Sequence, residues 1–85
     1  MSESASDKNA LRAFGAAVNE LRTERNMSVS ELATAAGTTT KRIERLEAGQ
    51  LDPPFDLMLA VADALSVRVS TIIFRASRHE QCEDL

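Results

Sequence analysis

The side chains with the richest chemistry lie in segment 39–48, where hydroxyl groups, cations and a carboxylate follow one another closely. If this segment is a helix, Lys41, Glu44 and Arg45 share one face, because successive residues turn by about 100°. Ile43 then lies on the opposite face. Lysine and arginine donate hydrogen bonds to guanine O6 and N7, and a carboxylate accepts one from the cytosine amino group. The polar face is therefore suited to contact the edges of nucleic acid bases.

The elements that position this face are predicted to be short helices with clear ends. Ser28 followed by Glu31 fits a capping box, which begins a helix, and Gly37 ends that helix. Thr39 is the predicted N-cap of the next helix, which Gly49 stops. Two short helices joined by a tight turn are the skeleton of a helix-turn-helix, here over residues 28–48.

Three further helices are predicted from apolar residues spaced three or four apart. They are marked by Leu11, Phe14, Val18 and Leu21, by Leu57, Met58, Val61, Ala62 and Leu65, and by Val67, Val69, Ile72 and Ile73 with a cap near Ser70. Only three Gly and two Pro interrupt the 85 residues, and 44% of the residues are hydrophobic. We therefore expect one all-α domain with a single core. We place this domain at 9–75, between a disordered leader at 1–8 and a polar tail at 76–85.

The order of these features over residues 14–74 resembles the phage repressor/Cro-type DNA-binding domain of the XRE family. The likeness lies in the stretch SVSELATAAGTTTKRIERLEAGQLDPPFDLMLAVADAL. It contains a capped helix with Leu-Ala, a glycine turn, a threonine-rich helix start, a hydrophobe followed by Glu, and a proline loop before a helix ending in Ala-Leu. The resemblance implies a compact five-helix bundle of the lambda-repressor-like type, with its third helix in the major groove of double-stranded DNA. The implied function is sequence-specific transcriptional regulation.

The resemblance also assigns base-contacting residues. The base-reading positions of the family fall on Thr39, Thr40, Lys41 and Arg45. From its chemistry and its place on the same face, we add Glu44 as an acceptor for cytosine.

Phosphate contacts are expected from Arg42, at the edge of this face, and from the start of the second helix. That start comprises Ser28, Val29 and Ser30, whose free N–H groups and helix dipole favour an anion. The family commonly has Gln as the first residue after the cap. Val29 therefore removes a side-chain contact and leaves the backbone amides.

Arg22 and Glu47 are the residues that, in this family, form a partly buried ion pair between the first and third helices. Glu47 is assigned this structural role. For Arg22 two roles stay open, support of the reading helix and contact with a phosphate.

A homodimer is expected, because one recognition helix covers few base pairs and members of the family usually bind palindromic operators as dimers. Phe55, Val69, Ile73 and Phe74 are candidate dimer contacts, with an ordinary place in the core as the alternative.

The net charge of −3 is unusual for a protein that binds nucleic acid. Between residues 22 and 45, however, five basic residues outnumber three acidic ones, which allows a locally basic face. The acidic total and Val29 favour the alternative of a protein-interaction module on the same fold, such as an antitoxin or an antiactivator. A controller protein of a restriction-modification system or mobile element is a second alternative, within the DNA-binding class.

The sequence has few features typical of enzymes, cofactor-binding proteins or membrane proteins. The single histidine, His79, lies three residues before Cys82, a spacing that metal sites use, but there is no second pair. We therefore expect an inert tail, no metal, no cofactor and no enzyme activity.

No apolar run approaches the roughly 20 residues that cross a bilayer, and the N-terminus lacks a signal-peptide pattern. We expect a cytoplasmic protein.

Overall fold

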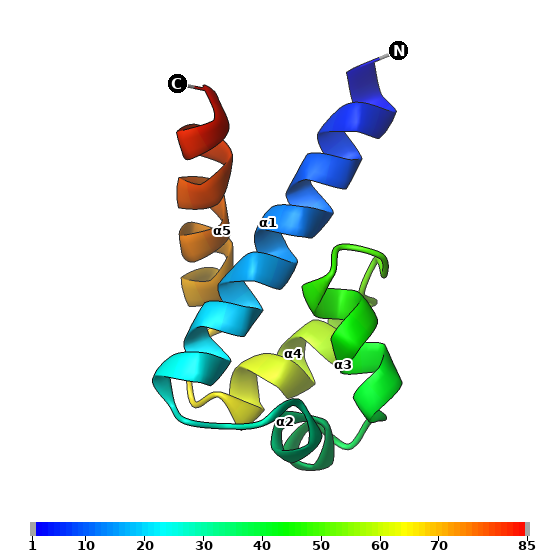
Figure 1. Ribbon diagram of the computed structural model, residues 1–85, viewed down its shortest axis with the longest axis vertical. Coiled ribbons are helices and arrows are strands. Elements are labelled where there is room, and N and C mark those ends of the chain that lie inside the picture. The colour runs from blue at the N-terminus through cyan, green and yellow to red at the C-terminus, as the bar shows by residue number, and fades with distance from the viewer. Residues whose placement is uncertain (1, 85) are drawn as a thin grey trace.

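The computed structural model describes the backbone of residues 2–84 and the side chains of residues 8–79. That backbone forms five helices and no strand (Figure 1). They are α1 (Ser2–Glu24), α2 (Val29–Ala36), α3 (Thr40–Glu47), α4 (Phe55–Ala64) and α5 (Val69–Asp84). α5 packs along α1, α3 packs against α1, and α2 packs against both α3 and α4. The predicted all-α, five-helix fold is confirmed.

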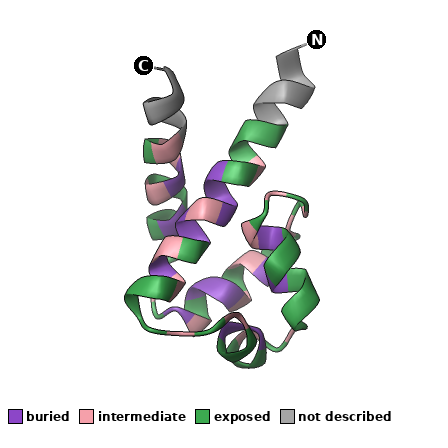
Figure 2. Cartoon of the chain, viewed as in Figure 1, coloured by how far each residue is buried: buried purple, intermediate pink, exposed green. Residues whose placement is uncertain are grey.

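The core lies where the inward faces of the five helices meet (Figure 2). The apolar stripe of α1 is buried as predicted at Phe14, Val18 and Leu21, whereas Leu11 is only half-buried. The largest fully buried side chains are Leu21, Leu32, Ile43, Leu46, Leu65, Ile72, Val18 and Val61. Aliphatic side chains therefore hold the helices together, as the scarcity of aromatic residues requires.

Gly15 allows the last turn of α3 to rest directly on the backbone of α1. A Cβ atom at this position would collide with the carbonyl oxygen of Leu46 and would lie 2.7 Å from that of Glu47. Any larger residue must therefore push the two helices apart. The position of α3 against α1 thus depends on a glycine that sequence reasoning did not single out.

Both terminal helices extend beyond the predicted domain limits. α1 begins at Ser2, whereas the sequence analysis placed a disordered leader at 1–8. α5 begins at Val69 and runs to Asp84, so the polar tail predicted at 76–85 is helical over 76–84. The helix continues past residue 75 because Ala76 is buried against the core.

Polar contacts between α1 and α5 add to this packing. Arg75 Nη1 lies 2.6 Å from Glu24 Oε2 and 3.2 Å from Glu20 Oε1, and His79 Nε2 lies 2.8 Å from Glu20 Oε2. The hydrogen bond from Arg75 lowers the pKa of the Glu24 carboxyl and raises the pKa of the guanidinium. These contacts hold α5 to α1 at the predicted end of the domain, residue 75, and at His79 beyond it.

Two further features can be stated for the described residues. No single helix is both long and apolar enough to cross a membrane, and the one combination that passes on length and composition, α4 with α5 as far as His79, is bent by 97°. No three His, Cys, Asp or Glu side chains gather into a metal-binding group there. His79 contacts Glu20, and the side chain of Cys82, its predicted companion, lies outside the described part.

Candidate nucleic-acid interface

α2 and α3 form a helix-turn-helix whose ends are set by local hydrogen bonds. Ser28 Oγ accepts from the Glu31 N–H at 3.0 Å, and Glu31 Oε1 accepts from the Ser28 N–H at 2.8 Å. Gly37 ends α2 with a left-handed φ of 71°, a conformation that glycine adopts without steric cost. Thr39 Oγ1 then accepts from the Arg42 N–H at 3.2 Å and begins α3. The two helices and their turn span the predicted range 28–48.

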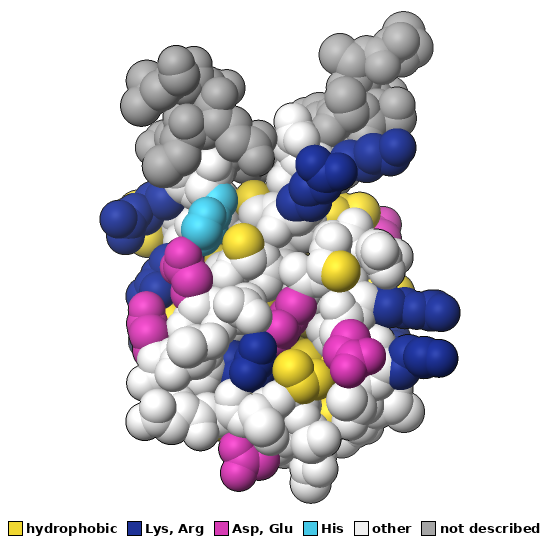
Figure 3. All heavy atoms as spheres, in the orientation of Figure 1, with side chains coloured by type: hydrophobic (Ala, Val, Ile, Leu, Met, Phe, Trp, Pro, Cys, Tyr) yellow, Lys and Arg dark blue, Asp and Glu magenta, His cyan; other side chains and the backbone are white. Residues whose placement is uncertain are grey.

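α3 separates an apolar face from a polar one. Ile43 and Leu46 are 0% and 1% exposed, whereas Lys41, Glu44 and Arg45 are all exposed. None of these three side chains has a hydrogen bond or ion pair with another residue in the range 8–79. Figure 3 shows Lys and Arg side chains projecting from the edge of the molecule where α3 runs in Figure 1. The outward face of α3 therefore presents two unpaired cations and one unpaired carboxylate.

The two predicted threonines lie at the start of this face. Both Thr39 and Thr40 are exposed. Thr39 uses its oxygen to cap the helix, so its hydroxyl hydrogen remains free to donate. Thr40 Oγ1 lies 3.5 Å from Ser30 Oγ, at the limit of a hydrogen bond, so a hydroxyl of α2 and one of α3 meet here.

The start of α2 lies beside the start of α3 and offers backbone donors. As first-turn residues, Val29 and Ser30 have N–H groups without an acceptor inside the helix. The Val29 side chain is half-buried and packs against the core, so it contributes apolar contact and no polar group. Arg42 is exposed at the edge of the face, beside a small hollow that Asp56 also lines.

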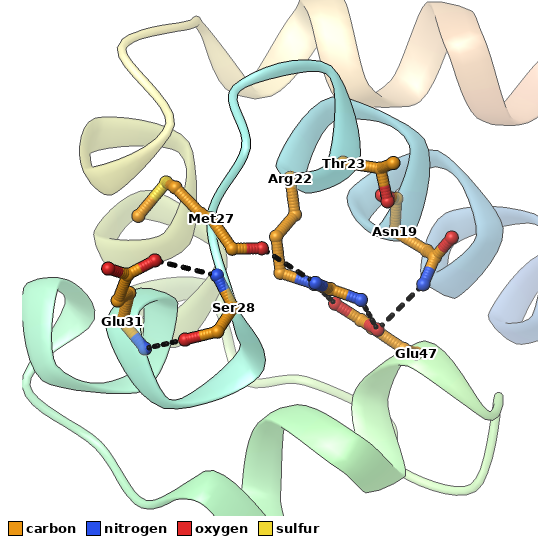
Figure 4. A network of polar contacts seen from close by, with 7 residues as sticks. All are labelled: Asn19, Arg22, Thr23, Met27, Ser28, Glu31 and Glu47. Carbon is orange, nitrogen blue, oxygen red and sulfur yellow. Dashed lines mark hydrogen bonds and ion pairs between the residues drawn. The ribbon is translucent and has the colours of Figure 1, made fainter.

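Behind this face, Arg22 joins three elements (Figure 4). Its Nε donates to Glu47 Oε2 at 2.7 Å and its Nη2 to Glu47 Oε1 at 3.1 Å, a two-point contact between α1 and the end of α3. Its Nη1 donates to the carbonyl oxygen of Met27 at 2.8 Å, directly before the Ser28 cap of α2. A single guanidinium thus sets the end of α3 relative to the start of α2.

The surroundings of this pair favour the structural role of Arg22. The side chains of Arg22 and Glu47 are 14% and 10% exposed, and the hydrogen bond to Glu47 raises the pKa of Arg22. All three guanidinium nitrogens already donate within the chain. A phosphate would have to compete with these partners for the Arg22 guanidinium.

Sequence reasoning missed one member of this network. Asn19 Nδ2 donates to Glu47 Oε1 at 3.0 Å, so the carboxylate receives three hydrogen bonds from α1. A signal was present, because Asn19 precedes Arg22 by three residues and therefore lies on the same face of the helix.

A helix-turn-helix with its second helix turned outward in this way defines a class of DNA-binding proteins. The Helix-turn-helix family model HTH_3 matches residues 18–72, and the chain belongs to this family. It is a DNA-binding transcription regulator of the XRE type. The sequence matches no curated protein.

Solved structures show the same architecture. A crystal structure of the clp gene regulator ClgR from Corynebacterium glutamicum matches with a TM-score of 0.85 at 24% identity, over 88% of this chain and 80% of that one. A second ClgR structure gives a TM-score of 0.80 at 26% identity, over 82% and 90%. The restriction-modification controller protein C.AhdI from Aeromonas hydrophila gives 0.72 at 29% identity, over 73% and 94%.

Proposed function

We propose that this regulator reads the major groove of a palindromic or pseudopalindromic operator as a homodimer, with α3 as the recognition helix. The observation that carries the proposal is the division of α3, which buries Ile43 while exposing the unpaired Lys41, Glu44 and Arg45. These side chains, with the hydroxyls of Thr39 and Thr40, are the proposed base contacts. Lysine and arginine suit guanine, and the carboxylate suits cytosine.

Phosphate contacts are proposed for the start of α2 and for Arg42. The cap at Ser28 leaves the amides of Val29 and Ser30 available, and an anion there would face the positive end of the helix dipole. Such contacts fix the register of a protein on the duplex without reading its sequence.

Dimerisation is proposed because regulators of this family bind double-stranded DNA and often act as dimers. The sequence candidates Phe55, Ile73 and Phe74 are exposed, whereas Val69 is half-buried against the core. Leu59 is a further exposed apolar residue that the sequence did not suggest. A regulator of this kind acts by binding DNA, so we propose a cytoplasmic location and no catalytic role.

Selection from a random-sequence duplex pool tests DNA reading. At salt concentrations of about 50 and 200 mM we expect one enriched inverted repeat, with affinity falling steeply between them. Lys41→Ala and Arg45→Ala should each relax the preference at one guanine, by about 1–3 kcal/mol. Lys8→Ala and Arg68→Ala, exposed cations away from α3, are the matched controls. Loss of selectivity in the controls, or none in the α3 variants, would contradict the proposal.

Val29 is half-buried and leaves α2 without a polar first side chain. This absence favours a second function, in which the fold binds a protein. A protein-interaction module on this fold, such as an antitoxin or antiactivator, would enrich no motif from the pool and would bind a protein partner. A controller protein, the class of C.AhdI, would instead behave in this selection as a DNA reader.

A further inference from the structure

One face of α1 follows the end of α3 and continues past it. Its residues are three or four apart in the chain, and they are Arg12, Gly15, Asn19 and Arg22. Asn19 and Arg22 donate hydrogen bonds to Glu47, and Gly15 lies against the last turn of α3. Arg12 is the next residue of this face, about one turn of α1 before Gly15. The face of α1 that supports α3 therefore ends in a cation.

The loop after α3 fixes the place of Arg12. Gly49, which directly follows the C-cap of α3, has a left-handed φ of 75°. A Cβ atom on Gly49 would lie 3.0 Å from the Cα atom of Arg12 and 2.8 Å from its Cγ atom. The loop therefore rests directly on the backbone of α1, which the missing side chain of Gly49 allows. The fold thus holds Arg12 beside the C-terminal end of α3.

The Arg12 side chain is exposed and has no hydrogen bond or ion pair within residues 8–79. Acidic groups on the neighbouring elements are not paired with it. Glu47 already accepts three hydrogen bonds from other residues of α1, and Asp52 lines an open apolar groove that α1, α4, α5 and the loop form. Lys8, one turn earlier on α1, adds a second exposed cation. Arg12 is therefore a positioned cation without a counterion on the chain.

We propose that Arg12 binds a phosphate of the DNA backbone beside the C-terminal end of α3. The inference rests on the proposed function and adds a contact at the end of α3. The phosphate contacts proposed above, at the start of α2 and at Arg42, all lie near the start of α3. A helix in the major groove lies between two phosphate backbones, so contacts at both of its ends would fix its tilt and depth.

Charge and position favour a phosphate as the ligand. Figure 3 shows Lys and Arg side chains on the upper part of α1 along the same edge of the molecule as those of α3. The planar guanidinium of arginine donates two parallel hydrogen bonds to one phosphate group. Arg12 belongs to α1 and lies outside the face of α3 that carries Lys41 and Arg45, so its contact would depend on salt and read no base.

Equilibrium titrations of the full chain with the selected operator duplex, at about 50 and 200 mM salt, test this contact. We expect Arg12→Ala to weaken binding by about 10-fold at the lower salt concentration. The slope of log affinity against log salt should become shallower by about one for each bound copy. The selected sequence should stay the same, because a phosphate contact carries no base preference. Arg12→Lys, which keeps the charge, should retain the slope and lose less affinity.

Two other exposed cations are the controls. Arg68 lies between α4 and α5, and Lys8 lies one turn of α1 farther from Gly49 than Arg12 does. Each alanine variant should lose much less affinity than Arg12→Ala. Circular dichroism melts establish that each variant is folded. An equal loss in Lys8→Ala would mean that the general charge of α1 acts rather than a local contact, and the proposal would be overturned.

Replacing single phosphates of the duplex with uncharged methylphosphonates gives the sharper test. One replacement should weaken the wild type and leave Arg12→Ala almost unchanged, because that variant has already lost the contact. Replacements at other phosphates should weaken both proteins equally. If every replacement weakened the two proteins equally, Arg12 would contact no phosphate and the proposal would be overturned.

The proposed function and the Arg12 contact fail in different ways. A wild-type chain that enriches an inverted repeat, with Arg12→Ala binding it equally well at both salt concentrations, overturns the Arg12 contact and leaves DNA reading standing. A wild-type chain that enriches no sequence overturns DNA reading and the Arg12 contact together.

Discussion

Replacing Glu47 with Ala should unfold the domain before it alters the outward face of α3. The carboxylate accepts hydrogen bonds of 2.7 and 3.1 Å from Arg22 and one of 3.0 Å from Asn19. Its removal leaves the Arg22 guanidinium, on a side chain only 14% exposed, with the carbonyl oxygen of Met27 as its remaining partner. The loss therefore combines broken charged hydrogen bonds with an uncompensated charge.

The magnitude follows from the burial of the pair. Truncating one partner of a fully buried ion pair costs about 3–5 kcal/mol. Water can reach part of the Arg22–Glu47 pair, so we expect about 2–4 kcal/mol. For a domain of this size, each kcal/mol shifts the melting temperature by about 4–8 °C. Glu47→Ala should therefore lower the Tm by at least about 8 °C. The free-energy loss behind this shift is a large share of the stability of a small domain.

Thermal unfolding followed by circular dichroism measures this effect. Glu44→Ala is the matched control, because it removes the same side chain from an exposed position of the same helix. The control should melt within a few degrees of the wild type and lose base preference instead. If Glu47→Ala melted like Glu44→Ala, the pair would not hold α3 to α1 and the argument would be refuted.

Three further predictions concern positions outside the outward face of α3. Gly15→Ala should destabilise the domain by about 1–3 kcal/mol despite the higher helix propensity of alanine, because the methyl group meets the end of α3. The control Ala16→Gly should cost about 1 kcal/mol from helix propensity alone. A Gly15→Ala protein more stable than the wild type would disprove the close approach of α1 and α3. Glu24 has a lowered pKa in the folded state, so its stabilising contribution is present above the ordinary value of 4.5 and is lost as the pH falls through the lowered pKa. The melting temperatures of Glu24→Gln and the wild type should therefore converge in acid. A difference that stayed constant with pH would count against the pairing of Glu24 with α5. Ser28→Ala should cost about 0.5–2 kcal/mol through loss of the helix cap, whereas Ser30→Ala should not, as urea titrations would show.

Much of the helix-turn-helix could be predicted because its signals are local. The capping box at Ser28, the left-handed turn at Gly37 and the cap at Thr39 each depend on groups within a few residues along the chain. The separation of Ile43 from Lys41 follows equally from helical periodicity, which needs no knowledge of the neighbouring helices.

The tertiary structure decided everything that depends on which helix meets which. Gly15 matters only because the end of α3 rests on α1, and Asn19 joins the Arg22 network only because Glu47 lies opposite it. The extent of α5 depends on burial of Ala76 in the core. The apolar groove likewise combines side chains from α1, α4, α5 and a loop.

The sequence alone therefore determined where α3 begins, where it ends and which face it turns outward. Only the tertiary structure decided what lies behind that helix and which large apolar side chains stay exposed on the surface. The reason is physical: caps and periodicity are governed by hydrogen bonds and dihedral angles a few residues apart, whereas packing joins residues far apart in the chain, whose approach no local pattern records.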